Sequence, residues 1–446
     1  MKESRHYGAM TLYDTLRYHD SLDRSSFHTP GHKCSGFFPE DLLQLDYTEL
    51  PDTDALYEAS GPILRSEKKL AHLFGAGRSL ISAGGCSLAI QAMLRLASMQ
   101  QGKILCARNA HRSAINACAL LGLEPVWLYP DSSRGFTGRI SPEDVRAAFE
   151  ENENITACYI TSPSYYGELC DIGSIAEICH ENGAILLVDN AHGSHLAFMK
   201  ENMHPMFLGA DMTACSLHKT LPVLTGGAVL NLRDESLGSA GKAAMSLFGS
   251  TSPSYPSMCS IDLCADYLEN GGAKEYARCE DTVSELKAAA VKKGIAMPEG
   301  KCDPLRLTLG TAAAGLSGDK QQSYFEDCGI DCEFCDGVKA VFIITPFNSE
   351  RDISRLRSAI ENMPVGNAAE CQSFEPVRPE KAMTLREALL SPTKIVPVAA
   401  SRGMIAADTA CPCPPGVPVV MPGELIDSLA ISEMQKRGMT EIIVVK

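Results

Sequence analysis

The 446-residue chain lacks the features that would place it in several other classes of protein. It has no run of the roughly 20 uncharged apolar residues that a membrane helix requires, and its start, MKESRHYGAM, lacks the apolar centre of a signal peptide. It also lacks a basic excess: its formal net charge is −15, whereas binding to nucleic-acid phosphates needs a basic face. We therefore expect a cytoplasmic protein with no membrane or nucleic-acid partner, whose acidity either attracts a cationic small molecule or serves solubility.

Cysteine is plentiful, with 18 residues, but a chain of this length can build a core without disulfides, so free and mostly buried thiols are expected. Cys328, Cys332 and Cys335 have the CxxxCxxC spacing of some iron–sulfur sites, and Cys411 and Cys413 form a CxC motif. The segment FEDCGIDCEFC, however, indicates a helix end, a turn at its glycine and a short strand. The three sulfurs then need not converge, and we predict no metal site.

Strands and helices alternate between residues 67 and 216, where apolar strands such as KILCA, ITACYIT and ILLVD are separated by amphipathic helices. This pattern is typical of a parallel sheet covered on both faces, so the predicted fold class is α/β. The chain divides into an N-terminal segment (1–60), a large domain (61–270), a smaller α+β domain (271–365) and a C-terminal domain (370–446). A stretch rich in proline and small residues links the last two.

Chemically distinctive residues directly follow the predicted strands. In an open α/β sheet the ligand crevice lies at the carboxyl ends of the strands, so these residues should meet at one edge. They are Gly84, Gly85, Cys86 and Ser87 after RSLISA, His111 after KILCA, Ser162 and Ser164 after ITACYIT, Asp189 at the end of ILLVD, and Ser216, His218 and Lys219 after MTACS.

Three of these positions suggest a chemistry, and each has an ordinary alternative. The turn before Ser87 opens a helix whose free N–H groups and dipole can hold a phosphate, although Ser87 could simply cap that helix. Asp189 is costly to bury alone; it could cap the next turn, pair with an arginine, or face a protonated ring nitrogen. Lys219 could be a surface charge, but an amine near a phosphate site and a buried carboxylate can lose its proton and form a Schiff base.

These three features together match the needs of pyridoxal 5′-phosphate (PLP): an anion site, a pyridinium partner and an imine-forming amine. His111 could then stack on the ring, although a lone histidine is more often an ordinary packing residue. A P-loop enzyme fits less well, because the motif GxxxxGK(S/T) is absent. We therefore predict a PLP enzyme that acts on a small-molecule amino acid.

A series of longer motifs runs along the chain in a fixed order. They are FHTPGHK (27–33), TELPDTDAL (48–56), ARNAHRSA (107–114), TSPSYYG (161–167), LLVDNAHGSH (186–195), SLHKTLPVLTGGA (216–228), STSPSY (250–255) and PPGVPVVMPGE (414–424). In this order they resemble the motifs of the bacterial ornithine/lysine/arginine decarboxylases, in the short form without an N-terminal wing domain. The resemblance implies a PLP-dependent transferase-like (fold type I) large domain with a mostly parallel sheet, and a homodimer or an assembly of dimers.

The resemblance also implies roles for matching residues. It makes Lys219 the Schiff-base lysine and Asp189 the partner of the pyridine nitrogen, with His111 and Ala191 on opposite faces of the ring. The implied catalytic set is Lys219, His218, His111 and Asp189. The implied cofactor-binding set is Cys86, Ser87, His111, Ser164, Asp189, Ala191, His192, Ser216, His218, Lys219 and, from the neighbouring subunit, Ser252.

The activity implied by the resemblance is decarboxylation of a basic amino acid to CO2 and the corresponding polyamine-pathway amine. Arginine or lysine is favoured as substrate over ornithine, and either His218 or Lys219 would return a proton to the reacting carbon. Three positions depart from the family's usual pattern: Asn190 replaces a glutamate, Cys86 a hydroxyl residue and Cys413 a tyrosine.

Two rival functions remain open on the sequence alone. The first is another PLP reaction, such as that of an aminotransferase or a lyase, which would usually need an arginine for the substrate α-carboxylate; Arg306 could serve in either case. The second is a catalytically silent PLP-fold regulatory subunit, which the departures from the family pattern would explain. The sequence does not choose among the basic amino acids; Glu424 and Asp408 are candidates for the pocket that binds the substrate side chain.

Overall fold

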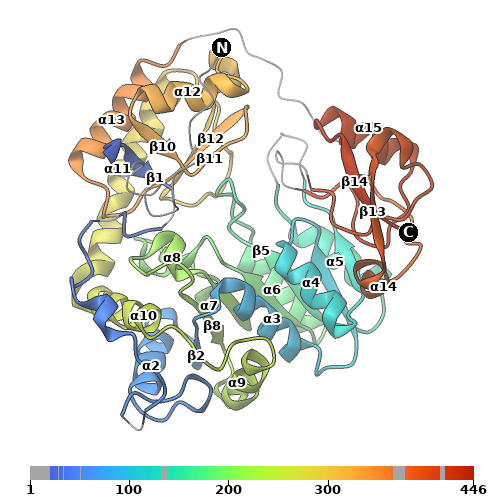
Figure 1. Cartoon of the computed structure of the whole chain (residues 1–446), viewed down its shortest axis with the longest axis horizontal. Coiled ribbons are helices and arrows are strands. Elements are labelled where there is room, and N and C mark those ends of the chain that lie inside the picture. Colours follow the sequence, from blue (N-terminus) through green and yellow to red (C-terminus); the bar gives the residue numbers. More distant parts are fainter. Residues whose placement is uncertain are drawn as a thin grey trace.

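The computed structural model describes the chain over residues 21–28, 30–33, 35–50, 52–131, 138–364, 377–411 and 417–446. These residues form a large domain around a central sheet, with two smaller domains at the upper left and upper right of Figure 1. Within the described ranges, no helix has both the length and the apolar composition needed to cross a bilayer.

The central sheet has seven strands in the order β2-β8-β7-β6-β5-β3-β4. The strands are β2 (Arg78–Ser82), β3 (Lys103–Ala107), β4 (Pro125–Leu128), β5 (Ile155–Thr161), β6 (Ile185–Asp189), β7 (Met212–Cys215) and β8 (Ala228–Leu232). Strand β8 pairs antiparallel with both β2 and β7, and the other pairings are parallel. The predicted α/β fold with a mostly parallel sheet is confirmed.

Helices cover both faces of this sheet. They are α2 (Pro62–Phe74), α3 (Gly85–Ala97), α4 (Arg112–Leu121), α5 (Pro142–Glu151), α6 (Ile172–Glu181), α7 (Pro205–Leu208), α8 (Leu217–Thr220), α9 (Gly238–Ser246) and α10 (Tyr255–Tyr267). Because side chains alternate along a strand, Leu187 of β6 packs in the apolar cluster of α3, α4 and α9, while Leu186 and Val188 pack in the cluster of α5 and α6. Both faces are thus buried, which explains the uninterrupted apolar strands.

The small domain follows a π-helical turn, Leu268–Gly272, and the long helix α11 (Ala273–Lys292). Its remaining elements are β9 (Arg306–Gly310), α12 (Asp319–Asp327), β10 (Ile330–Cys332), β11 (Phe334–Cys335), β12 (Lys339–Ile343) and α13 (Glu350–Glu361). Strands β11, β12 and β9 form an antiparallel sheet, whereas β10 pairs in parallel with β1 (Ser25–Phe27). Residues Ser25–Phe27 of the N-terminal segment are therefore bound to the small domain.

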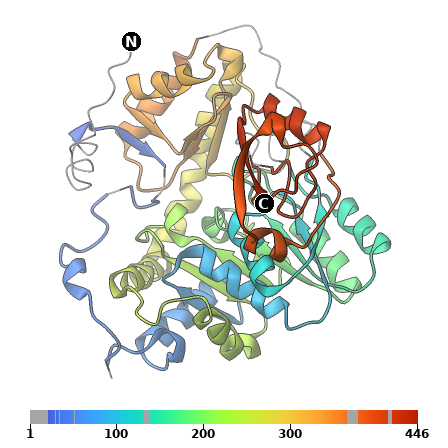
Figure 2. The same cartoon turned by 45° about the vertical axis from the view of Figure 1, so that its right-hand side comes forward.

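The C-terminal domain lies against the large domain beside α4, as the turned view in Figure 2 shows. Its elements are α14 (Leu385–Leu390), β13 (Thr393–Pro397), α15 (Ser428–Lys436) and β14 (Glu441–Val445). It has an apolar cluster of its own, while Leu385 and Met421 join the cluster of α3 and α4. A buried ion pair also joins the two domains: the Arg108 guanidinium donates to both carboxylate oxygens of Glu424, at 2.7 and 2.6 Å.

The described cysteines are free thiols, and many are buried. Helix α12 ends at Asp327, Gly329 has a φ of 71° and β10 begins at the next residue, so the predicted helix, turn and strand are confirmed. Among the described residues, no group of three His, Cys, Asp or Glu side chains could hold a metal ion. Cys413 lies outside the described residues.

Candidate active site

Lys219 lies on α8, the single helical turn that follows strand β7. Its Nζ atom is 2.8 Å from Nε2 of His192. Burial lowers the pKa of Lys219, and the positive charge of Arg306 adds to this, against the opposing charges of Asp189 and Glu333. The amine is therefore not a solvated surface charge, and its uncharged, nucleophilic form is favoured.

Asp189 ends strand β6 and is buried, with an exposed fraction of 2%. Its Oδ2 accepts a hydrogen bond from the Tyr159 hydroxyl at 3.0 Å, and its Oδ1 accepts one from the Ala191 N–H at 3.1 Å. The carboxylate thus does hold the next turn, one of its ordinary roles, but within the described ranges no arginine pairs with it. Its charge influences the pKa of Lys219, His111 and Cys86, so these residues surround one site.

The turn between β2 and α3 leaves the first N–H groups of the helix without a side-chain cap. Gly84 is the N-cap residue and Gly85 has a φ of 75°, in the region that favours glycine. Ser87 is exposed and does not cap the helix, so that alternative is wrong. The Cys86 thiol faces Asp189, and burial followed by this charge raises its pKa well above the usual value. Uncapped N–H groups at a helix start suit a phosphate.

Two histidines of the predicted site are held by neighbouring groups. His111 is the N-cap of α4, where its Nδ1 accepts from the Ser113 N–H at 3.2 Å. Nδ1 of His218 lies 3.2 Å from the Ser216 hydroxyl. Burial lowers the pKa of both His111 and His218, so the uncharged imidazole is favoured at each.

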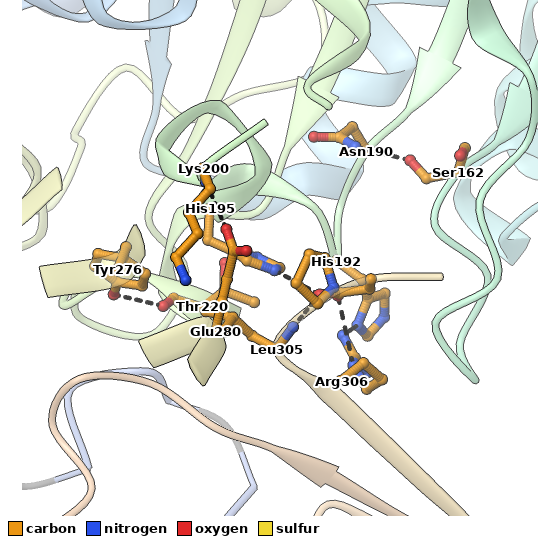
Figure 3. Close-up of polar contacts among 12 residues, drawn as sticks. Ser162, Asn190, His192, His195, Lys200, Thr220, Tyr276, Glu280, Leu305 and Arg306 are labelled. Carbon is orange, nitrogen blue, oxygen red and sulfur yellow. Dashed lines mark hydrogen bonds and ion pairs between the residues drawn. The ribbon is translucent and has the colours of Figure 1, made fainter. Parts of the chain in front are cut away.

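Other predicted residues have different surroundings. Ser164 is buried, and its hydroxyl donates to the Glu168 carboxylate at 3.1 Å. Ser252 is exposed in the loop between α9 and α10. Asn190 donates from its amide to the carbonyl of Ser162 at 2.7 Å, a contact drawn in Figure 3.

The suggested side-chain pocket residues Glu424 and Asp408 do not come together with Lys219. Glu424 is paired with Arg108, and its Oε2 also accepts from the Met421 N–H at 2.8 Å. Asp408 forms an ion pair with Arg112. Both carboxylates therefore connect the C-terminal domain to the loop around His111.

The sequence predicts His192 and Arg306 as candidate site residues but does not predict the contact between them. An Arg306 Nη2 lies 3.2 Å from Nδ1 of His192, and Nη1 donates to the Tyr165 carbonyl at 3.1 Å. Figure 3 shows the guanidinium reaching the histidine ring from the start of β9. His192 thus stands between the Lys219 amine and the Arg306 guanidinium.

Glu333 lies between β10 and β11 and accepts a hydrogen bond from the Tyr165 hydroxyl at 3.1 Å. The Tyr165 ring in turn meets the His192 ring edge-on, with centroids 5.2 Å apart. Burial lowers the pKa of both Lys219 and His218, and the Glu333 charge opposes this lowering at each. The small domain therefore contributes an acidic group to the site.

Gly31, in the FHTPGHK motif, packs directly on the turn that carries Lys219. Its N–H donates to the His218 carbonyl at 2.7 Å, and a Cβ at this position would lie 2.7 Å from the backbone carbon of Thr220. From α11, the Tyr276 hydroxyl donates to the Thr220 carbonyl at 2.7 Å (Figure 3). The motif itself was the only sequence signal for this contact.

Two family models match the chain. The model of the Orn/Lys/Arg decarboxylase major domain matches residues 10–297, and that of the C-terminal domain of the same family matches residues 368–436. An arginine decarboxylase of Bacillus subtilis (strain 168) is 30% identical over 455 residues, which cover 95% of this chain and 93% of that protein.

Solved structures share the fold. Lysine decarboxylase A from Pseudomonas aeruginosa superposes with a TM-score of 0.77 at 18% identity, covering 97% of this chain and 80% of that one. A structure of serine palmitoyltransferase (SPT) with PLP superposes with a TM-score of 0.59 at 13% identity, covering 76% of this chain and 86% of that one. The predicted resemblance is confirmed by the family models and the fold by these structures.

Proposed function

Because the chain belongs to the Orn/Lys/Arg decarboxylase family, we propose that it removes the α-carboxylate of a basic amino acid as CO2, with PLP as cofactor. The observation that carries the proposal is Lys219, a partly buried amine whose lowered pKa favours the nucleophilic form. It shares one sheet edge with the buried carboxylate of Asp189 and the uncapped start of α3.

The residues present fit PLP. When bound, PLP supplies an aldehyde that condenses with amines and a ring that withdraws electrons from the breaking bond. Asp189, fixed by Tyr159 and by the Ala191 N–H, would keep the ring nitrogen protonated. The uncapped N–H groups of α3, with Ser216 and His218 nearby, would hold the phosphate.

The remaining step needs a proton at the carbon that has lost CO2. We assign it to Lys219 and keep His218 as the alternative. Nδ1 of His218 is already engaged by the Ser216 hydroxyl and by the Gly226 N–H, at 3.2 and 3.4 Å. Lys219 Nζ, by contrast, can take a proton from the substrate ammonium group and return it to this carbon, while His192 Nε2 at 2.8 Å holds the amine in place.

The substrate class follows from charge. A basic side chain needs an anion at its far end, and we assign this role to Glu333, whose carboxylate is held by Tyr165 within electrostatic reach of Lys219. Arginine is favoured because the relative that matches 95% of the chain is named an arginine decarboxylase; lysine is the second candidate. We also propose a homodimer, in which the exposed Ser252 of one subunit reaches the site of the other.

The rival aminotransferase function would use Arg306 to bind the substrate carboxylate. Its guanidinium instead donates to the His192 ring and to the Tyr165 carbonyl. Tight binding of a carboxylate that is lost as neutral CO2 would stabilise the substrate more than the transition state. The contacts of Arg306 therefore favour decarboxylation.

The test is a product assay on purified protein with L-arginine, L-lysine and L-ornithine. We expect CO2 and the matching amine, fastest with arginine, together with an imine absorbance that borohydride removes. Lys219→Ala should abolish both signals, whereas Lys301→Ala, at an exposed lysine paired with Glu201, should leave both unchanged. Keto-acid formation without CO2 would establish an aminotransferase, and absorbance without turnover of any of the three would establish a silent subunit.

A further inference from the structure

We propose that, in the chain without cofactor, Arg306 fixes the tautomer of His192 and thereby holds Lys219 as an uncharged amine. The inference rests on the proposed function, because an uncharged lysine is needed to reach an aldehyde carbon. It adds a positioning residue, Arg306, that acts on Lys219 through His192.

The first step concerns Nδ1 of His192, which faces Arg306 at 3.2 Å. A guanidinium has only N–H donors and stays charged in proteins, so Nδ1 must be the acceptor. Burial lowers the pKa of His192 well below its usual value, and the charges of Lys219 and Arg306 lower it further. The ring is therefore neutral, and its single proton is on Nε2.

The second step concerns Lys219, whose Nζ lies 2.8 Å from that Nε2. An Nε2–H group can only donate, so Nζ must accept with a lone pair. An ammonium group has three donors and no lone pair, and would place two donors against each other. The geometry is satisfied only when Lys219 is an uncharged amine.

Arg306 is itself held in place. A Cβ on Gly167, whose φ is 92°, would lie 2.7 Å from the Arg306 Cγ, so only glycine lets the arginine stem pass. The Arg306 Nε is 3.9 Å from Oδ2 of Asp303, a buried oxygen that has no hydrogen-bond partner among the described residues. The other oxygen, Oδ1, accepts from His195 and from the Leu305 N–H. Asp303 thus balances the arginine charge without taking its Nη2 group away from His192.

The neighbouring charges explain why such a device is needed. Burial lowers the pKa of Lys219, but the charges of Asp189 at the end of β6 and Glu333 between β10 and β11 oppose this lowering and favour the ammonium form. Burial lowers the pKa of His111 and of His218, which favours their neutral forms. The Cys86 thiol of α3 stays protonated because burial raises its pKa. The hydrogen bond from His192 Nε2–H to Lys219 Nζ therefore favours the uncharged amine, against the effect of the two carboxylates.

The test measures the protonation of Lys219 directly in the full chain, stripped of cofactor. Brief acetic anhydride labelling across a pH series, read by peptide mass spectrometry, gives the pH midpoint of each lysine. Arg306→Met should raise the Lys219 midpoint by about one pH unit or more, which is about a tenfold loss of reactivity at neutral pH.

Lys287 is the matched internal control. It is also a buried lysine whose pKa is lowered by burial and by the charge of Arg306. Its Nζ, however, donates to the Asp303 and Pro304 carbonyls at 3.0 and 3.2 Å and has no histidine partner. A shift at Lys219 alone supports the proposal. Equal shifts at both lysines would mean that Arg306 acts only by charge, and no shift at Lys219 would also overturn the inference.

A second measurement needs no Arg306 variant. In the wild-type chain without cofactor, ¹⁵N spectra of the histidine rings, with His192→Gln for assignment, should show the Nε2–H tautomer at neutral pH. The Nδ1–H tautomer or an imidazolium ring would overturn the proposal. Neither readout uses turnover, so an inactive chain fails the CO2 assay and leaves these results untouched.

Discussion

Arg108 and Arg306 are both almost fully buried, with exposed fractions of 1% and 3%, yet their partners differ. Arg108 forks onto both oxygens of Glu424 and donates to the carbonyls of Pro418 and Val419. Arg306 has its nearest carboxylate at 3.9 Å, from Asp303, and points instead at a histidine ring.

The difference shows that burial alone does not reveal the role of a charged residue. A buried cation with a matched anion joins two domains, and its hydrogen bonds leave no group available for other work. Arg306, whose anion Asp303 is offset, keeps an N–H donor for the neutral His192 ring and can thereby direct which ring nitrogen carries the proton. The following changes separate the two cases.

The largest effect is expected for Arg108→Met. It leaves the Glu424 carboxylate buried without its partner, which should lower the free energy of unfolding by about 3–5 kcal/mol, measured by guanidinium denaturation. The double variant Arg108→Met/Glu424→Leu should recover most of this loss, because an apolar pair replaces a buried ion pair at little cost. A double variant as unstable as the single one would refute the assignment of a structural pair.

Arg306→Met should act mainly on the reaction. We expect kcat/KM for the best substrate at neutral pH to fall about 10-fold, equivalent to about 1.4 kcal/mol, with the acid limb of the pH profile moved to higher pH. The reason is that Lys219 would then be protonated over more of the range. A loss that is the same at every pH would contradict this account.

Asp303 gives a pH window for stability. Burial alone would raise the pKa of Asp303. The charge and hydrogen bond of His195, together with the charge of Arg306, instead lower this pKa from 3.8 to about 2. A carboxyl with a depressed pKa stabilises the fold above its unfolded value and loses this as pH falls. About 2 kcal/mol should therefore be present above pH about 4 and lost towards pH about 2. Asp303→Asn should lack this part of the pH dependence of the unfolding free energy.

The smallest effect is expected for Arg112→Gln. Arg112 comes from the same loop as Arg108 and also reaches the C-terminal domain, through Asp408, but its side chain is 62% exposed. Exposed pairs contribute less than about 1 kcal/mol, so the unfolding free energy should barely change. A loss comparable to that of Arg108→Met would remove burial as the explanation of the difference.

The parts of the molecule that sequence could predict are those set by local periodicity. Uninterrupted apolar strands predicted the sheet, and the rule that ligand sites follow strand ends placed Asp189 and Lys219 at one edge. The pairing of β1 with β10 could not be predicted, because three residues of strand carry little pattern and their partner lies far along the chain.

Polar partners were harder to predict than strands. Arg306 contacts His192 across 114 residues of sequence, and Arg108 contacts Glu424 across 316. Periodicity predicts that a position is buried but does not predict which side chain it will contact. Ser87 shows the reverse error, because a residue type that often caps helices is exposed here beside a helix that has no side-chain cap. Which polar groups meet is decided by tertiary packing.

Two residues, Gly31 and Tyr276, form hydrogen bonds with the backbone of α8. Both lie in segments that belong to the small domain or pair with it. Gly31 follows the strand that pairs with β10, and Tyr276 is on α11 beyond the π-helical turn; both bind the carbonyls that flank Lys219. A displacement of the small domain would therefore act on the backbone on both sides of the reactive amine, which couples the position of Lys219 to that of the small domain.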